Sequence, residues 1–383
     1  MIVHNTRKIN ERISYYADVE QINSIIARTF AVPIENYALV PDVPAQMDIG
    51  ALEMQKTMLQ CGKQLSFDEA VIATICMYLL DDSEENTSCI PDEVIEQIVK
   101  HGHVFHHGDI EENPYYKNIR IEPHTCGRFT LDVDNYKKYE LFPWNTEFFT
   151  EHGFVIPPIG TTDHKIKFPI LAENGLVWMS ISLNEIYTMR KPIEQALGNV
   201  LVFGCGLGYF AYMAALKDTV SHVTIVEKQP EVIELFTNYI LPQFSCKDKI
   251  TVIQGDAFDY IKDMQDGEYD FCFVDIWSGI DDPMPYLRMK ALCRRFQTTT
   301  MSYWLEDAIA ANLTTYVFVQ LLISLYQSQG APEQDFTEDR EDGMETIQYI
   351  ENLLKDVTIT RPEQIDELMN PRHLIKMIER YDG

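Results

Sequence analysis

The sequence predicts an α/β protein built around a doubly wound, mainly parallel sheet, with a helical N-terminal domain and a small β-rich segment before the sheet. Two observations lead to this prediction. From Gly198 onward, short strand-like runs alternate with helix-forming segments. These runs are continuously apolar rather than alternating, which is typical of strands whose two faces are both covered by helices.

Residues 1–100 are expected to form a helical N-terminal domain. Ser66 is followed three residues later by Glu69 and then by an apolar run, which is the spacing of a capping box at a helix start. The predicted helices are Lys8–Thr29, Gln46–Gln60, Ser66–Leu80 and Pro91–Lys100.

Residues 101–182 are expected to form a β-rich linking segment. Arg128–Val133 is β-prone, and the runs Lys165–Leu171 and Leu176–Ile181 flank Asn174-Gly175. Asn-Gly favours a tight turn because both residues tolerate positive φ, so a hairpin is predicted here.

Residues 183–305 carry the predicted parallel sheet. Proline at position 230 suits the first turn of a helix. Helices are predicted at Tyr209–Leu216, from Pro230, and at Pro285–Arg295. The predicted strands are Asn199–Phe203, Ser221–Val226, Ile250–Ile253, Tyr269–Val274 and Gln297–Tyr303.

Residues 306–383 are predicted to be a helical C-terminal extension. Ala308–Tyr326 has no charged residue and is long enough to cross a bilayer. It contains asparagine, threonine, glutamine and serine, so a buried core helix is the preferred interpretation. Ala331–Gly343 is rich in acids and is expected to be a solvated loop.

The net charge of the chain argues against some classes of binding partner. The chain has 383 residues and a formal net charge of -28, which disfavours nucleic acid and anionic membranes as partners and suits a cationic small molecule. The eight cysteines form no CxxC pair, as expected for reduced thiols in a cytoplasmic protein. The sequence leaves the oligomeric state open, and a homodimer is compatible with it.

The stretch VLVFGCGLGYF, residues 200–210, runs from a predicted strand through three glycines into a predicted helix. Gly204, Gly206 and Gly208 allow a ligand to approach the backbone closely. The dinucleotide fingerprint GxGxxG would require glycine where Tyr209 stands. The turn therefore fits an adenosine cofactor other than NAD.

Acidic residues follow the next three strands. Glu227 ends the second strand and has the position and chemistry to accept ribose hydroxyls. Asp256 and Ala257 follow the third strand, where they could flank an adenine ring. Asp275 follows the fourth strand and is expected at the same sheet edge.

These four segments resemble the motif series of class I S-adenosylmethionine-dependent methyltransferases, and within that superfamily they are most similar to the spermidine synthase-like branch. The resemblance covers about residues 175–305 and implies a Rossmann-like fold that binds S-adenosyl-L-methionine. It implies that Asp275 faces the sulfonium and the nucleophile as the catalytic residue. It further implies cofactor-binding roles for Gly204, Gly206 and Gly208 at the methionine part, Glu227 at the ribose, and Asp256 and Ala257 at the adenine.

The chain departs from these families at several positions. Phe203 stands where many methyltransferases have an acid, and Ser278 stands where polyamine synthases have a second aspartate, although Asp281 and Asp282 lie close. Asn184–Tyr187 replaces their Tyr-Gln-Glu element. Strands six and seven of the methyltransferase sheet are not evident after Tyr303.

Three functions are therefore considered. The preferred one is an S-adenosylmethionine-dependent methyltransferase in which Asp275 orients or deprotonates an amine or hydroxyl of a small-molecule acceptor. The first alternative is a spermidine synthase-like aminopropyltransferase. The second is a non-catalytic module for cofactor binding or assembly.

Other residues could bind a metal or line the pocket, but their sequence patterns are less specific. His103 and His107 in HGHVFHHGD have helical metal-ligand spacing, but the flanking glycines favour a polar loop, and no metal site is predicted. Trp277 and Tyr286 could line the substrate pocket or pack in the core. Glu185 and Tyr187 could reach the same pocket.

Overall fold

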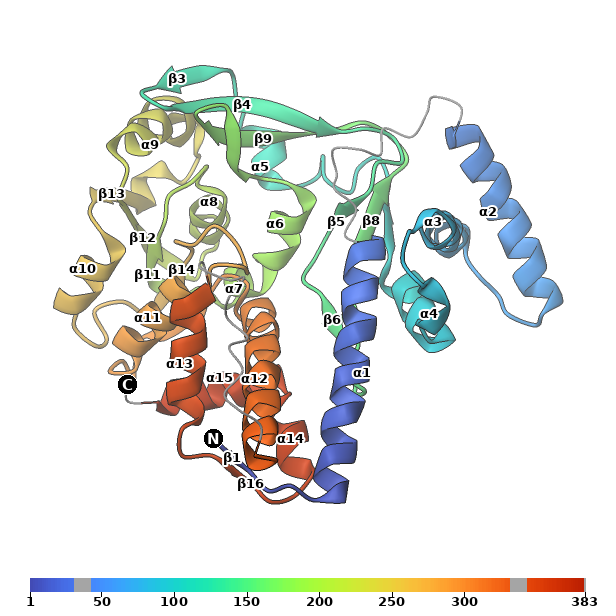
Figure 1. Ribbon diagram of the computed structural model, residues 1–383. Helices are drawn as coiled ribbons and strands as arrows, with labels where there is room; N and C mark the ends of the chain where they lie inside the picture. The colour runs from blue at the N-terminus through green and yellow to red at the C-terminus, as the bar shows by residue number, and fades with distance from the viewer. Residues whose placement is uncertain (31–42, 331–342, 382–383) are drawn as a thin grey trace.

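The computed structural model describes residues 1–30, 43–330 and 343–381, and its centre is a five-stranded sheet (Figure 1). Neighbouring strands all run parallel, in the order β13-β12-β11-β14-β15. The strand order reverses between β11 and β14, and such switch points bind ligands beyond the carboxyl ends of the strands. The bounds are β11 Gly198–Phe203, β12 Val220–Glu227, β13 Ile250–Gln254, β14 Phe271–Val274 and β15 Thr300–Tyr303.

Helices cover both faces of this sheet, which confirms the predicted doubly wound α/β fold. Along β11, Val200 and Val202 join one core cluster, whereas Leu201 and Phe203 join the other. Successive side chains of a strand point to opposite faces, so both faces are apolar. The first face is covered by α8 (Tyr209–Ala215) and α9 (Pro230–Leu235), and the second by α10 (Ala257–Asp263) and α11 (Met284–Cys293).

The long apolar helix α12 (Glu306–Ser328) follows β15 directly. Within the described residues it is the one helix long and apolar enough to cross a membrane, and 67% of its most apolar window is buried. Ile309, Leu313 and Val317 are fully buried and belong to the second core cluster. It is followed by α13 (Met344–Leu354), β16 (Thr358–Ile359), α14 (Glu363–Leu368) and α15 (Pro371–Arg380).

The predicted hairpin forms one side of a second sheet, which has the order β10-β9-β4-β3. Its turn has Asn174 at φ 51° and Gly175 at φ 83°, the two positive values that Asn-Gly was expected to supply. This sheet lies over α9 and α8 (Figure 1). The bounds are β3 His124–Cys126, β4 Phe129–Tyr136, β9 Ile166–Glu173 and β10 Leu176–Ser180.

The region from His103 to Gln195 also contains short strands and helices outside these two sheets. The strands β2 (His103–Phe105), β8 (Ile159–Thr162) and β5 (Phe142–Pro143) form a three-stranded sheet, and β6 (Phe148–Phe149) pairs with β7 (Val155–Ile156). The short helices are α5 Pro114–Asn118, α6 Leu183–Thr188 and α7 Arg190–Gln195.

In the described part of residues 1–101, four α-helices lie close to the predicted bounds. Ser66 Oγ accepts the Glu69 N–H at 3.1 Å, and the Glu69 carboxylate accepts the Ser66 N–H at 2.7 Å, so the predicted capping box is present. The helices are α1 Arg7–Phe30, α2 Val43–Gln60, α3 Phe67–Asp82 and α4 Asp92–His101.

The first helix also packs against the C-terminal helices, which the sequence did not indicate. Ile9 and Ile13 of α1 are buried in the same cluster as α12. Arg12 forms an ion pair with Asp366, and β1 (Ile2–Val3) pairs in parallel with β16. The domain boundaries at residues 100, 182 and 305 stay predictions. The predicted acidic loop lies outside the described residues, apart from Gly343.

The packing of α1 generates a stability prediction. Ile9→Ala removes a side chain with no exposed surface and should lower the free energy of unfolding by about 2–5 kcal/mol. Ile49→Ala makes the same change on α2, where the side chain is 58% exposed, and should change stability by less than about 0.5 kcal/mol. Denaturant unfolding of both variants checks this, and equal effects would contradict the packing of α1.

Candidate functional site

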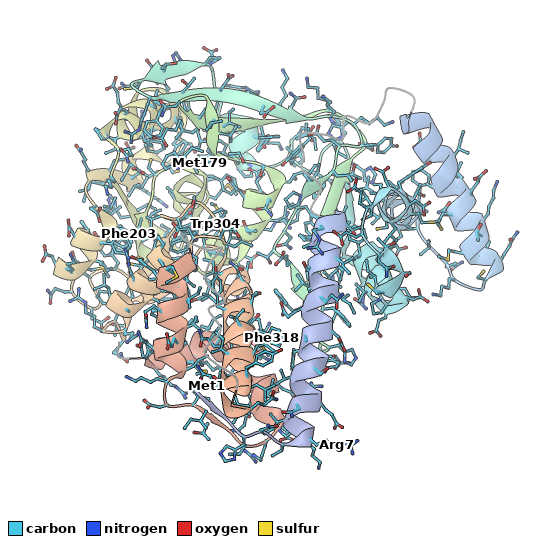
Figure 2. The ribbon with its side chains drawn as sticks, viewed as in Figure 1. Met1, Arg7, Met179, Phe203, Trp304 and Phe318 are labelled. Carbon is cyan, nitrogen blue, oxygen red and sulfur yellow. The ribbon has the colours of Figure 1, made fainter. Side chains whose placement is uncertain are left out.

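A cavity of about 490 Å³ opens at the carboxyl ends of β11, β12, β13 and β14. Its volume is within the range of small-molecule and cofactor sites. The lining also includes Trp178 and Met179 of the hairpin and Trp304, which follows β15. Met179 and Trp304 lie in the middle of the molecule in Figure 2. The cavity lies at the switch point of the sheet, where the sequence analysis places the ligand.

The glycine turn forms the floor of this cavity. Gly204 has φ +96°, and a Cβ there would lie 2.1 Å from the Asp275 carbonyl oxygen. Gly208 has φ +72° and begins α8, and a Cβ there would lie 2.3 Å from the Phe236 ring. Larger residues would therefore push the turn away from β14 and from the core. Gly206 faces Met179, whose sulfur would be 2.2 Å from an added Cβ.

Glu227 at the end of β12 is 5% exposed and connects the strand to the glycine turn. One carboxylate oxygen accepts the Cys205 N–H at 2.9 Å, and the other accepts the Gln229 N–H at 2.8 Å. These bonds fix the carboxylate at the cavity wall. Each carboxylate oxygen can accept a second hydrogen bond, so a ligand hydroxyl can still be bound.

Asp256 lines the cavity, but its carboxylate also begins a helix. One oxygen accepts the Phe258 N–H at 2.8 Å as the N-cap of α10, and the other pairs with Lys228 at 3.0 Å. Burial acts to raise the pKa of Asp256, but Lys228 and the amide bonds outweigh it, so the pKa lies below its usual value. Ala257 is buried beside it and also lines the cavity.

Asp275 and Glu185 form a pair of carboxyl groups with raised pKa. Burial raises the pKa of Asp275 to about 7, and the charge of Glu227 adds to the shift. Burial raises the pKa of Glu185 to about 8, and the charge of Asp275 contributes; the hydrogen bonds from Ser180 oppose the shift. Perturbed carboxyl groups in a cleft are a common property of catalytic sites.

Carboxylates dominate the charge of the cavity. Among the described residues, its lining contains five acidic side chains and one basic side chain, Lys228, which pairs with Asp256. The acids are Glu185, Glu227, Asp256, Asp275 and Asp282. Because the basic residue already has a partner, the cavity favours a cationic ligand.

The other candidate residues differ in whether they reach this cavity. Tyr286 has no exposed surface and donates its hydroxyl to Glu306, so it packs in the core. Trp277 contacts Tyr286 but also lines the cavity. Tyr187 lies under the Arg190 guanidinium and is not part of the cavity lining. Burial raises the pKa of the Cys205 thiol well above its usual value, which suits packing rather than reaction.

The sequence analysis gave Glu185 and Asp282 little weight. Asp282 is seven positions beyond Asp275 and reaches the cavity through the loop after β14. Glu185 comes from α6, before the sheet begins. The only sequence signal for Glu185 was its place where polyamine synthases have the Tyr-Gln-Glu element. Trp178 of the hairpin and Trp304 also line the cavity. Apart from their being tryptophans, nothing in the sequence indicated this position.

Comparisons with known proteins match the central part of the chain. Residues 185–309 match the domain family described as "Spermine/spermidine synthase domain". A sequence search of curated proteins finds no match. Spermidine synthase from Thermotoga maritima is 16% identical, with a TM-score of 0.29, over 43% of this chain and 60% of its own. An SAH-bound methyltransferase from Podospora anserina is 17% identical, with a TM-score of 0.27, over 37% of this chain and 65% of its own.

The chain thus spans less than two thirds of the length of these solved structures, and the overall similarity to them is low. The family match covers the glycine turn, Glu227, Asp256 and Asp275 together with all five strands of the central sheet. Residues 185–309 are therefore similar to the spermine/spermidine synthase domain, and this part of the chain has a mainly parallel, doubly wound α/β fold like that domain.

Proposed function

We propose that this protein is a transferase that binds a sulfonium nucleoside and transfers its aminopropyl-type group to a small cationic amine. The observation that carries the proposal is the charge of the cavity. Glu185, Asp275 and Asp282 line it, and its one basic residue, Lys228, pairs with Asp256. Such a lining favours two positively charged ligands, the sulfonium donor and a protonated amine acceptor.

The described residues fit a nucleoside. Glu227 offers a fixed carboxylate for ribose hydroxyls, and Asp256 with Ala257 borders the space proposed for the adenine. The indole N–H of Trp277 is buried and has no hydrogen-bond partner within the described residues. A ligand acceptor atom could satisfy that N–H group, since buried polar groups in folded proteins normally have partners.

The cavity also favours a decarboxylated donor over S-adenosylmethionine itself. S-adenosylmethionine has an α-carboxylate, which a cationic side chain would bind best, and among the described lining residues the only cation, Lys228, pairs with Asp256. The decarboxylated form keeps the ammonium group and lacks the carboxylate. Its sulfonium supplies an alkyl carbon attached to a good leaving group.

Asp275 and Glu185 would position the acceptor. With pKa values of about 7 and about 8, they can exchange protons with an ammonium group near neutral pH. In the transfer, ionised Asp275 or Glu185 first accepts a proton from the ammonium group, which frees the nitrogen lone pair. The neutral amine nitrogen then forms a bond to the carbon beside sulfur as the carbon–sulfur bond breaks, and sulfur leaves as a neutral thioether. The rest of catalysis is alignment.

Methyl transfer from S-adenosyl-L-methionine is the second candidate function. Two observations favour it: the glycine turn suits that cofactor, and Ser278 replaces the second aspartate of polyamine synthases. The acidic cavity would then bind a cationic acceptor in the same way. A small-molecule partner, a cytoplasmic location, and no nucleic-acid or membrane partner are part of the same proposal. Homodimer formation is also compatible with it.

The deciding experiment offers the purified chain each sulfonium donor separately with a mixture of polyamines and identifies the products by mass spectrometry. The expected result is an aminopropylated amine and 5′-methylthioadenosine from the decarboxylated donor. Methylated product and S-adenosylhomocysteine would instead establish methyl transfer. Binding of either donor without any product would support a non-catalytic module and contradict both enzymatic functions.

Glu227→Gln should weaken binding of the sulfonium nucleoside about 10- to 100-fold, because a charged acceptor of ribose hydroxyls contributes about 1.5–3 kcal/mol. Glutamine keeps the side-chain shape and can still accept the Cys205 N–H. Isothermal titration calorimetry measures the change. Glu194→Gln, an exposed residue on α7, is the matched control and should bind as the wild type does.

Activity should rise with pH through the pKa values of Asp275 and Glu185, from about 7 to about 8, because only their ionised forms hold the ammonium and accept its proton. Asp275→Asn should lower kcat/KM by about 100-fold or more and remove the lower step from the pH profile. Steady-state rates between pH 6 and 9 test this. Asp218→Asn, on an exposed loop, should leave the profile unchanged.

A further inference from the structure

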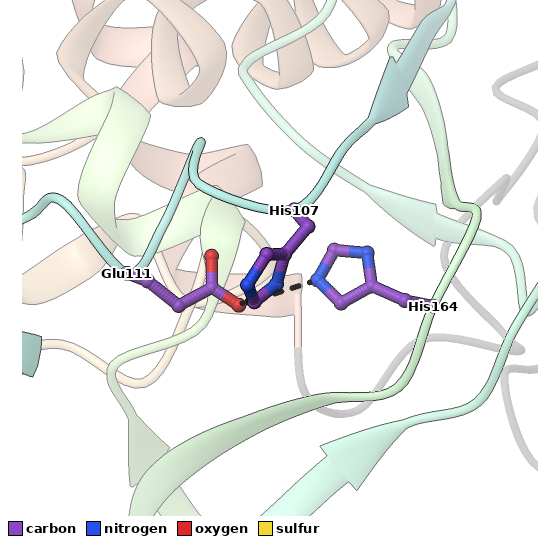
Figure 3. Close-up of side chains that lie close together, drawn as sticks. All are labelled: His107, Glu111 and His164. Carbon is purple, nitrogen blue, oxygen red and sulfur yellow. Dashed lines mark ion pairs between the residues drawn. The ribbon is translucent and has the colours of Figure 1, made fainter.

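Two histidines meet at the ends of neighbouring parallel strands, away from the sheet that carries the cavity. In the pairing of β2 with β8, Phe105 lies opposite Thr162. His107 and His164 each follow two residues later, so the register that pairs the strands also brings these side chains together. Figure 3 shows the two rings converging on Glu111, which belongs to the loop after His107.

The potential ligand atoms have the separations of a metal site. Glu111 Oε1 lies 3.1 Å from His107 Nδ1 and 3.4 Å from His164 Nε2. All three atoms lie within 4.8 Å of one another. Ligand atoms at about 2.0–2.1 Å from a tetrahedral zinc ion are about 3.3–3.4 Å apart, so only small movements would be needed to coordinate one.

Further contacts aim two of these ligands at the centre of the cluster. Asp163 holds His164 Nδ1 at 2.7 Å, which places the proton on Nδ1 and leaves the lone pair on Nε2. The Gly108 N–H donates to Glu111 Oε2 at 2.8 Å and leaves Oε1 facing the histidines. A carboxylate behind a ligating histidine is a recurrent feature of metal sites.

His164 Nε2 is buried and has no hydrogen-bond partner within the described ranges of the chain. Its ring is mostly covered, with 22% of the side chain exposed, whereas 82% of His107 is exposed. A buried nitrogen lone pair without a donor is unfavourable unless a ligand such as a cation binds it. One side of the cluster is open to solvent, so an ion can enter.

The sequence offered His103 with His107 as a metal-binding pair but favoured a polar loop, and residues 107–112 do form turns rather than a helix. His103 lies in strand β2 and packs against Phe105 and Trp144, so it is not beside His107. The glycines did exclude a helix, as predicted, but β-structure forms before the turn. The second histidine of the cluster is 57 positions further along the chain than His107, beyond the reach of spacing rules.

We propose that His107, Glu111 and His164 form a binding site for a divalent transition metal, with zinc as the best match. Two imidazole nitrogens and one carboxylate oxygen are a ligand set that zinc accepts, and a water molecule can complete the tetrahedron. The ion would tie the loop after β2 to the segment after β8. The site does not share a residue with the cavity, so it stands independently of the proposed transfer reaction.

Isothermal titration of the metal-free full-length chain with Zn²⁺ tests the site. The exposed thiols Cys61 and Cys89 are first replaced by serine, because they could bind zinc themselves. One equivalent of zinc should bind, and His107→Ala and Glu111→Gln should each lower the affinity at least tenfold. Asp163→Asn should lower it about 10- to 100-fold through loss of the histidine orientation.

Two further measurements keep the test decisive. Titration with Co²⁺ should give the visible absorption bands of a tetrahedral nitrogen and oxygen site, and His107→Ala should remove them. His152→Ala, an exposed histidine elsewhere, should bind zinc as the background protein does. His107 is largely exposed, so its replacement should not prevent folding. Absence of zinc binding, or binding that His107→Ala and Glu111→Gln leave unchanged, would overturn the proposal.

Discussion

The carboxylate of Glu227 is the contact on which the site depends. Its two oxygens accept the N–H groups of Cys205 and Gln229, so the end of β12 holds the glycine turn in place. The same charge contributes to the raised pKa of Asp275 on β14. One buried group therefore links the shape of the turn to the protonation of the neighbouring acid. The glycines are required because β11 and β14 leave 2.1 Å between the Asp275 carbonyl and a Cβ at Gly204.

The acidic residues of the cavity lower the stability of the empty protein but favour binding of a cation. The charge of Glu227 raises the pKa of Asp275, the charge of Asp275 raises the pKa of Glu185, and burial favours the neutral forms of Asp275 and Glu185. Such an arrangement is unfavourable for the empty protein at high pH and becomes favourable when a cation enters. Buried charged groups that reduce stability are common at functional sites.

The sequence predicted the elements well because they depend on local patterns. Continuous apolar runs such as VLVF specify buried strands, Ser66 with Glu69 specifies a helix start, and Asn174-Gly175 specifies a turn. Residues that meet across the fold were harder to predict. Glu185 reaches the cavity from α6, and His164 reaches His107 only through the pairing of β2 with β8. Asp256, which was predicted to flank the adenine, lines the cavity, and its carboxylate also caps α10.

The pairing of β1 with β16 and the ion pair of Arg12 with Asp366, 354 positions apart, have a consequence for synthesis of the chain. The ribosome releases α1 long before α12 and the helices that cover it, so the apolar stripe containing Ile9 and Ile13 is uncovered during most of translation. Domains that depend on such late contacts fold slowly and expose surfaces that chaperones recognise. The second core cluster includes Leu374 and Ile378, so it can close only after almost the whole of this chain has been translated.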